Sequence, residues 1–407
     1  MGIQSIIKKI FMFKFINHSS SKKDRKMLSV LKLSMATFII FFQGFMVAPL
    51  LPLFSKYFQV TVKHASFIEP AYLMGYGLFT LIYAALSDRY GRYRIICFSL
   101  VLFITLTILT AFVQNINQLI VLRLFTGIGA AGVAPTTISW ISDTFAYHKR
   151  GHALGIFFGC MAGGTAFGAC AGALVTSLIG WRGLFILVAL IGLIISIIII
   201  KSKKAIFKGE ETSVDKVSVF KTYSIILKKR RARLTYIYVV FNGMFHSGIF
   251  AWLGYFFYKN FSLNEAEIGL AMLGYGIPGL LLGPFLGRVA DRYGRNIIIP
   301  IGIFISALAV FILSQNVNLV FSNALVALLS LGFDLSHPLF AAIVTTFSSR
   351  KGATTGLFAF FLFIGYGLGS LVLSLIVHIG LELSFQLFAY AAFAASICSI
   401  YVFKDEK

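Results

Sequence analysis

The sequence predicts an all-α membrane protein, with twelve transmembrane helices in two pseudo-symmetric six-helix bundles. Its apolar composition, its long uncharged runs and a repeat between its two halves lead to this fold class. Hydrophobic residues make up 58% of the chain and charged residues 12%, and the mean hydropathy is +0.88. Soluble proteins carry roughly twice that share of charge. The composition therefore excludes a water-soluble globule.

Long apolar runs predict helices that cross the bilayer. Residues 184–200, for example, contain no charged side chain. About 20 helical residues cross a hydrocarbon core of ~30 Å, and a helix satisfies its own backbone hydrogen bonds in lipid. The predicted spans are 33–54, 66–86, 94–113, 118–140, 151–177, 183–200, 233–257, 266–287, 296–314, 318–346, 353–378 and 383–403.

The basic residues are distributed unevenly among these spans. The chain carries 36 Lys and Arg against 14 Asp and Glu, a formal net charge of +22. If the N-terminus is cytoplasmic, most Lys and Arg fall in cytoplasmic segments, which is the positive-inside pattern. The charge thus predicts an inner (plasma) membrane protein with both termini cytoplasmic, and no nucleic-acid partner.

The predicted domains follow from the spans and the charge. They are a basic cytoplasmic tail (1–32), an N-terminal bundle (33–200), a cytoplasmic linker (201–232), a C-terminal bundle (233–403) and a second tail (404–407). The four cysteines lie in apolar runs without the spacing of a metal site or a disulfide framework. We therefore expect no metal and no cofactor.

The two halves repeat one another. The segment SDRYGR (87–92) follows the second span, and ADRYGR (290–295) follows the eighth, 203 positions later. Three glycines of the fifth span recur in the eleventh with a shift of 201 positions. They are Gly155, Gly164 and Gly168, matched by Gly356, Gly365 and Gly369. Two like-oriented halves with a cleft between them are typical of transporters that work by alternating access.

The repeated loop resembles a known signature. Residues 287–295 (GRVADRYGR) are similar to the loop motif of the major facilitator superfamily, and 84–92 (AALSDRYGR) is a copy with Ala84 as its first residue. The resemblance covers 33–403 and implies that charged loop residues join helix ends when the cytoplasmic side is closed. It also implies a pair between Arg92 and Asp143; the matching position in span ten is Val344. The motif residues are Asp88, Arg89, Gly91, Arg92, Asp143, Gly287, Asp291, Arg292, Gly294 and Arg295. The alternative is that these charges only set the topology.

The fourth span contains an arginine within the membrane. Residues 123–131 (RLFTGIGAA) resemble the family's fourth-span motif, with Thr126 where the family usually has Gln. An arginine at this depth is costly unless it faces a partner or water, so Arg123 is a functional candidate. Glu69 lies at a similar depth, which predicts an ion pair. Alternatively, Arg123 extends to the outer headgroups and Glu69 lies at the interface.

The fifth span resembles the motif of exporting antiporters in the superfamily. It contains Gly155, Gly164, Gly168 and Gly172, but Ala169 replaces the motif's proline and Ala173 its last glycine. Small residues allow helices to approach closely, so plain helix packing is the alternative interpretation.

Few polar groups lie near mid-membrane depth. Asp334 and His337 share one face of span ten, and His246 lies on span seven. A carboxylate near the bilayer centre usually marks a proton or substrate path. We therefore predict Asp334 as the proton site, tuned by the histidines, with Glu69 and Arg123 as further candidates for proton coupling. A structural Asp–His pair is the alternative. The candidates for cavity contacts are Gln43, Asn242 and Trp252, since spans one, four, seven and ten line the cavity in the family.

These features predict a secondary active transporter of a small organic compound, with proton-coupled efflux by alternating access. Its partners would be the substrate, protons and the lipid bilayer, and the chain would be monomeric. A proton-coupled importer or facilitator of a metabolite is one alternative, and a non-transporting receptor or scaffold is another. No phosphate-binding Gly-x4-Gly-Lys loop or catalytic triad occurs in the sequence, so we expect no enzyme activity.

Overall fold

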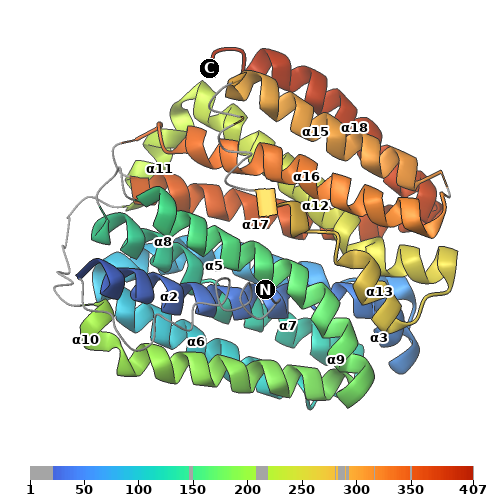
Figure 1. The fold of residues 1–407 in the computed structure, drawn as a ribbon, viewed down its shortest axis with the longest axis horizontal. Coiled ribbons are helices and arrows are strands. Elements are labelled where there is room, and N and C mark those ends of the chain that lie inside the picture. The colour runs from blue at the N-terminus through green and yellow to red at the C-terminus, as the bar shows by residue number, and fades with distance from the viewer. Residues whose placement is uncertain are drawn as a thin grey trace, which may run out of the picture.

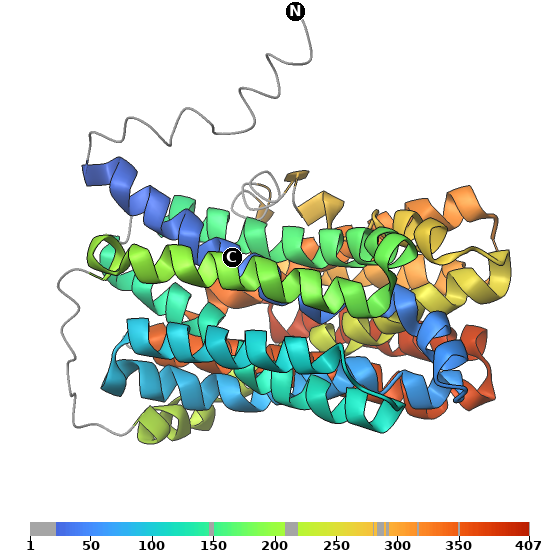
Figure 2. The same cartoon turned by 90° about the horizontal axis from the view of Figure 1, so that it is seen from below.

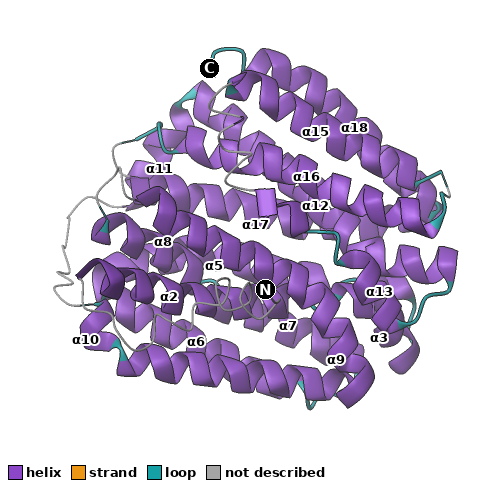
Figure 3. Cartoon of the chain, in the orientation of Figure 1, coloured by secondary structure: helices purple, strands orange, loops and turns teal. Residues whose placement is uncertain are grey.

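The computed structural model describes residues 22–145, 150–207, 219–279, 281–282, 289, 293–315, 317–348 and 351–406. Within these ranges every regular element is a helix (Figure 3). The helices are α2 (Lys22–Phe45), η2 (Ala48–Leu50), α3 (Leu51–Tyr57), α4 (Val62–Ala65), α5 (Ile68–Tyr90), α6 (Arg92–Thr110), α7 (Ile116–Ala130), α8 (Val133–Thr144), α9 (Arg150–Lys201), α10 (Lys203–Ile206), α11 (Val219–Lys228), α12 (Arg230–Phe261), α13 (Glu265–Met272), α15 (Arg295–Leu313), α16 (Leu319–Val344), α17 (Lys351–Ile376), η4 (Val377–Ile379) and α18 (Leu381–Val402).

The long helices run roughly parallel and form two groups. Helices α2 to α10, the N-half, fill the lower part of Figure 1. Helices α12 to α18 are the C-half; most of them fill the upper part, while α13 lies at the right, against α9 of the N-half. We call the end of the molecule that carries Arg92 and Arg295 the motif end, at the left of Figure 1, and the other the opposite end. The view turned by 90° shows the same stack, with α2 and α9 adjacent (Figure 2).

The helices are consistent with the twelve predicted spans. Nine helical stretches in the described part of the chain are long and apolar enough to cross a membrane. The longest, within α9, contains two passes, because the backbone turns at Gly180 (φ 73°). Lys32 Nζ of α2 donates a hydrogen bond of 2.7 Å to Ser202 Oγ, directly after α9. The second pass of α9 therefore ends beside the first half of α2. Helices α5 and α13 lie where the second and eighth spans were predicted.

Several helix bounds differ from the prediction. Helix α2 begins at Lys22 and α12 at Arg230, within the segments predicted as tail and linker. Hydropathy identifies only the part of a helix that lies in lipid. The backbone hydrogen bonds of the helix can continue into polar residues outside the membrane. The fourth span is also broken into α7 and α8 at residues 131–132, while α16 in the C-half is continuous.

The backbone confirms the duplication. Gly91 (φ 89°, ψ 143°) and Gly294 (φ 88°, ψ 147°) directly precede α6 and α15 in the two copies of the loop motif and have almost the same dihedral angles. A side chain would be strained at a positive φ, which explains the glycine in both copies. Gln59 and Ser262, which both have a φ of 53°, end the first and seventh spans 203 positions apart.

Helix packing repeats as well. A Cβ atom added to Gly168 of α9 would lie 2.6 Å from the carbonyl oxygen of Phe42 on α2. A Cβ atom added to Gly369 of α17 would likewise overlap the carbonyl oxygen of Met244 on α12. Each half therefore packs its fifth helix directly on the backbone of its first.

The closest described approaches between the halves lie from mid-depth to the opposite end. A Cβ atom added to Gly254 would be 2.6 Å from the Ala48 carbonyl oxygen, and one on Gly269 would be 2.6 Å from Ala173 Cβ. Near the motif end the corresponding distance from Gly356 to Ala84 Cβ is 3.9 Å.

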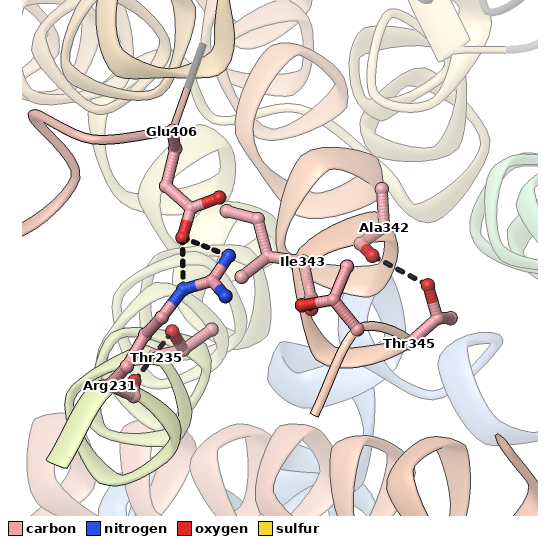
Figure 4. A network of polar contacts seen from close by, with 7 residues as sticks. Arg231, Thr235, Ala342, Ile343, Thr345 and Glu406 are labelled. Carbon is pink, nitrogen blue, oxygen red and sulfur yellow. Dashed lines mark hydrogen bonds and ion pairs between the residues drawn. The ribbon is translucent and has the colours of Figure 1, made fainter. Parts of the chain in front are cut away.

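At the motif end the chain's last residues bind the C-half. Arg231 Nε, at the start of α12, donates a 2.5 Å hydrogen bond to Glu406 Oε1, beside the end of α16 (Figure 4). The Asn296 amide, at the start of α15, donates to the Glu406 carbonyl at 2.9 Å. Glu406 therefore joins α12 and α15 to the segment after α18.

Candidate functional site

Arg123 on α7 is fully buried and bound to the end of α2. Its Nη1 donates to Gln43 Oε1 at 2.8 Å and to the Gln43 carbonyl at 3.1 Å, and its Nη2 donates to the Gly44 carbonyl at 2.8 Å. Its guanidinium also lies 4.2 Å from the ring centre of Tyr72. Helix α2 ends at Phe45, and the last four carbonyls of a helix have no partner within it, so they can accept from a guanidinium.

Glu69 is close to this cluster but does not take part in it. Among the described residues, the ion pairs do not include Arg123 with Glu69, so the predicted pair is not formed in this structure. Glu69 is 4% exposed, and its Oε1 has no hydrogen-bond partner. The alternative of an extended Arg123 does not fit either, because this side chain is 0% exposed.

Asp334 lies on α16 against the segment that follows α13. Ser330 Oγ, one turn earlier, lies 3.3 Å from Asp334 Oδ2, and the Gly279 backbone also hydrogen-bonds to the carboxylate. A Cβ atom added to Gly279 would be 2.5 Å from Asp334 Oδ1, so the absence of a side chain there makes room for the carboxylate. Within the described ranges no ion pair joins Asp334 to a cation.

The two predicted histidines are buried beside an aromatic ring rather than bound to Asp334. The Phe333 ring centre lies 4.7 Å from the rings of both His246 and His337, and it is stacked on the latter. His246 Nδ1 is 3.4 Å from the hydroxyl of Tyr275. His246 Nε2 and His337 Nδ1 are buried without a hydrogen-bond partner. The structural Asp–His pair is therefore not formed in the region that the structure describes.

An aromatic layer joins the two halves at mid-depth. The ring centres of Tyr76 on α5 and Phe363 on α17 are 4.1 Å apart. Phe45 at the end of α2 contacts Phe250 at 5.5 Å and Tyr366 at 6.2 Å. The sequence analysis did not identify Tyr76, Phe363 or Tyr366, since their meeting depends on how the two halves pack together.

Repeat symmetry is the signal that could have identified two further residues. Tyr72 and Tyr275 lie 203 positions apart, and each belongs to a buried polar cluster of its half. Tyr72 hydroxyl donates to the Ile40 carbonyl at 3.1 Å, whereas that of Tyr275 lies near His246. Gln43 and His246 are likewise 203 positions apart.

The remaining predicted cavity residues lie in different places. Asn242 is buried, and its Oδ1 accepts from Ser336 Oγ of α16 at 3.4 Å, while its Nδ2 has no partner. Trp252 is 1% exposed and donates from Nε1 to Ser374 Oγ at 3.3 Å. It therefore belongs to the packed contact near the opposite end, while Asn242 faces the tenth span.

The loop motif forms an ion pair between Arg92 and Asp143. The position in the C-half that is equivalent to Asp143 is Thr346 rather than Val344. The N-cap residues Asn115 and Asn318 show that the fourth and tenth spans are offset by 203 positions. Neither position carries an acid. The exposed Arg89 lies over the ring of Tyr90, and Arg295 begins α15. Outside the described residues are Gly287, Asp291, Arg292 and the side chain of Asp88.

The fifth-span glycines form a packing surface. Added Cβ atoms would lie 2.5 Å from the Phe38 carbonyl oxygen at Gly164 and 2.8 Å from Met46 Cβ at Gly172. With Gly168, these residues let α9 approach α2. The surroundings of Gly155 lie outside the described part of the chain.

Comparisons with known proteins agree with this fold. A model described as Major Facilitator Superfamily matches residues 33–264 and 235–407. An uncharacterized MFS-type transporter of Methanocaldococcus jannaschii is 24% identical over 328 residues, which cover 80% of this chain and 84% of that protein. Multidrug resistance protein 3 of Bacillus subtilis is 33% identical over 134 residues, 33% of this chain and 26% of that protein. The inward-facing, unoccupied crystal structure of a bacterial homologue of the human lysosomal transporter Spinster has a TM-score of 0.73 and 17% identity, and the match covers 96% of this chain and 99% of that one.

Proposed function

Because this chain belongs to the major facilitator superfamily of transporters, we propose that it exports a small organic compound in exchange for protons by alternating access. The observation that carries the proposal is the environment of Asp334. This carboxylate lies within a membrane-spanning helix, hydrogen-bonded to a hydroxyl and a backbone group and to no cation among the described residues.

Neutral partners suit a group that gains and loses a proton during a cycle. The Ser330 hydroxyl can donate to a carboxylate and can accept from a carboxylic acid, so both protonation states of Asp334 keep a partner. An ion-paired carboxylate would lose its counter-ion interaction on protonation. By that criterion Asp334 is a better proton carrier than Asp143, which is paired with Arg92.

We infer that the structure represents a state closed at the opposite end. The tight contacts of Gly254 and Gly269 with the N-half support this, together with the hydrogen bond of 2.7 Å from Ser66 Oγ to Ser374 Oγ. The positive-inside pattern predicts that the motif end is cytoplasmic, so this state would be closed toward the outside. Reporter fusions within 208–218 and near Lys259 test the orientation: they should be cytoplasmic and external, and both on one side would contradict it.

Export of an amphipathic compound is supported by three features. The fifth-span glycines are similar to the antiporter motif, and the aromatic layer offers ring faces to an apolar or aromatic substrate. A third of the chain also resembles a protein named for multidrug resistance. We further propose that the chain works as a monomer in the inner membrane and needs no cofactor.

Transport in proteoliposomes tests the proposal. The compound is chosen from growth-inhibition and uptake profiles of a strain that lacks the gene, and a pH-sensitive dye inside the vesicles follows protons. We expect Asp334→Asn to abolish accumulation driven by a pH gradient while exchange without a gradient continues. Asp405→Asn, at an exposed position, is the matched control.

The outcomes separate the alternatives. Accumulation by Asp334→Asn under a pH gradient would refute the assignment of this residue, and Glu69 would become the leading candidate. Accumulation with the opposite gradient would indicate an importer. If wild-type protein moves no compound and no protons, the receptor or scaffold alternative would hold instead.

A further inference from the structure

Two lysines at equivalent positions bind equivalent carbonyl groups. Lys26 Nζ, in the first turns of α2, donates to the Thr144 carbonyl at 2.9 Å. Lys229 Nζ, at the N-cap of α12, donates to the Phe347 carbonyl at 2.7 Å. Both donors and both acceptors are separated by 203 positions, although Thr144 and Phe347 differ in kind. The fold thus repeats a backbone contact rather than a side-chain motif.

The acceptors are carbonyls that need an external donor. Thr144 is the last residue of α8, and Phe347 lies just beyond the end of α16. Carbonyls at a helix C-terminus lack intrahelical donors and carry the negative end of the helix dipole. A lysine ammonium is therefore a suitable partner there.

Other polar contacts at the motif end differ between the halves. In the N-half the fourth helix is also bound through Asp143 to Arg92. In the C-half the acid at this end is Glu406, and it binds Arg231. The lysine contact is the one of these three that both halves share.

Each half also joins its first and fourth helices at a second level. In the N-half Arg123 of α7 binds Gln43 of α2. In the C-half Ser336 Oγ of α16 lies 3.4 Å from Asn242 Oδ1 of α12, although the Gly332 and Phe333 carbonyls are nearer acceptors for its hydroxyl. Two separate contacts along a pair of helices restrict both sliding and splaying, whereas a single contact would act as a pivot.

We propose that Lys26 and Lys229 are positioning residues that hold the first and fourth helices of each half together at the motif end throughout the transport cycle. Each half then moves as one body when access alternates. This inference rests on the proposed alternating access. It concerns contacts within a half, so it does not depend on the proton site or the direction of transport.

Cross-linking tests whether the contacts persist. The four native cysteines are first replaced by serine in a variant that still transports. Lys26→Cys is then combined with Thr144→Cys, and Lys229→Cys with Phe347→Cys, and each pair is bridged by a flexible, cleavable thiol reagent. We expect each bridged protein to transport within about twofold of its unbridged form. Transport that stops on bridging and returns on cleavage would overturn the proposal.

Removing the ammonium tests whether the contacts matter for the rate. In the double variant Lys26→Met/Lys229→Met we expect the maximal transport rate to fall about tenfold while the apparent KM stays within about twofold. The double arginine variant should restore the rate, and Lys228→Met, at an exposed neighbour, is the control. A double methionine variant as fast as Lys228→Met would refute the role.

A distance measurement keeps this inference separate from the proposed function. Spin labels at the motif ends of α2 and α8 should show a broader distance distribution in Lys26→Met than in Lys228→Met. This readout needs no substrate, so it remains decisive if wild-type protein transports nothing. Equal distributions would refute the contact's role. A folding defect alone would lower the yield of folded, labelled protein but would not broaden the distance distribution of the protein that remains folded.

Discussion

At the residue scale, Arg123 shows what determines the partner of a buried charge. The sequence identified this arginine as functional but paired it with Glu69, the acid at matching depth. Its actual acceptors are Gln43 and the carbonyls left free where α2 ends. Hydropathy places a helix end only to within several residues, so these acceptors could not be predicted from the pattern.

This arrangement predicts unequal effects of two substitutions. Gln43→Ala removes an acceptor from a buried guanidinium, which should lower the free energy of unfolding by about 1–3 kcal/mol. Glu69→Gln removes a carboxylate whose Oε1 has no partner, so stability should change by less than about 0.5 kcal/mol. Thermal unfolding of the purified variants in one detergent measures both. The opposite order would mean that an Arg123–Glu69 ion pair stabilises the protein after all.

At the element scale, backbone contact between helices depends on particular glycines. Gly168 of α9 lies against the Phe42 carbonyl, whereas an added Cβ at Gly159 of the same helix would meet nothing within 4 Å. A glycine-to-alanine substitution therefore creates a steric conflict at Gly168 but none at Gly159.

Gly168→Ala should destabilise the protein by about 1–3 kcal/mol, because the new methyl group cannot fit without separating α9 from α2. Gly159→Ala should be neutral or slightly stabilising, since alanine favours a helix. Melting temperatures and the yield of monodisperse protein report both effects. A Gly168→Ala variant as stable as Gly159→Ala would mean that α9 and α2 can separate at little cost.

The sequence predicted the helices better than their surroundings. Spans such as 296–314 and 383–403 agree closely with α15 and α18, because a run of apolar residues and a helix in lipid have the same cause. The break between α7 and α8 was not predicted, whereas the turn at Gly180 lies between the predicted spans 151–177 and 183–200. Trp252 was expected in a cavity but lies in a packed contact, since hydropathy does not tell which helix a buried face meets.

At the scale of the whole molecule, the two halves share a backbone but differ in charge. Positions 203 residues after Arg123 and Glu69 hold Val326 and Met272, and the position 203 before Asp334 holds Ala131. The charge asymmetry follows from the sequence once the offset is fixed. The aromatic layer does not, because it depends on side chains of both halves meeting at mid-depth.

The opposite end holds a polar contact that crosses between the halves. Ser66 Oγ donates to Ser374 Oγ, and Trp252 donates to the same oxygen. All three residues are buried. If the halves move as bodies, this contact must separate when the opposite end opens, whereas contacts within a half persist.

The last prediction is that a covalent bond at this contact stops transport. In the cysteine-free variant, Ser66→Cys with Ser374→Cys should form a disulfide, because the two hydroxyl oxygens are 2.7 Å apart. Oxidation should reduce transport at least tenfold and reduction should restore it, while each single cysteine variant is unaffected by either treatment. Labelling of a cysteine at the motif end should continue in the oxidised protein. Full transport with the disulfide in place would show that this end does not open, and would contradict alternating access.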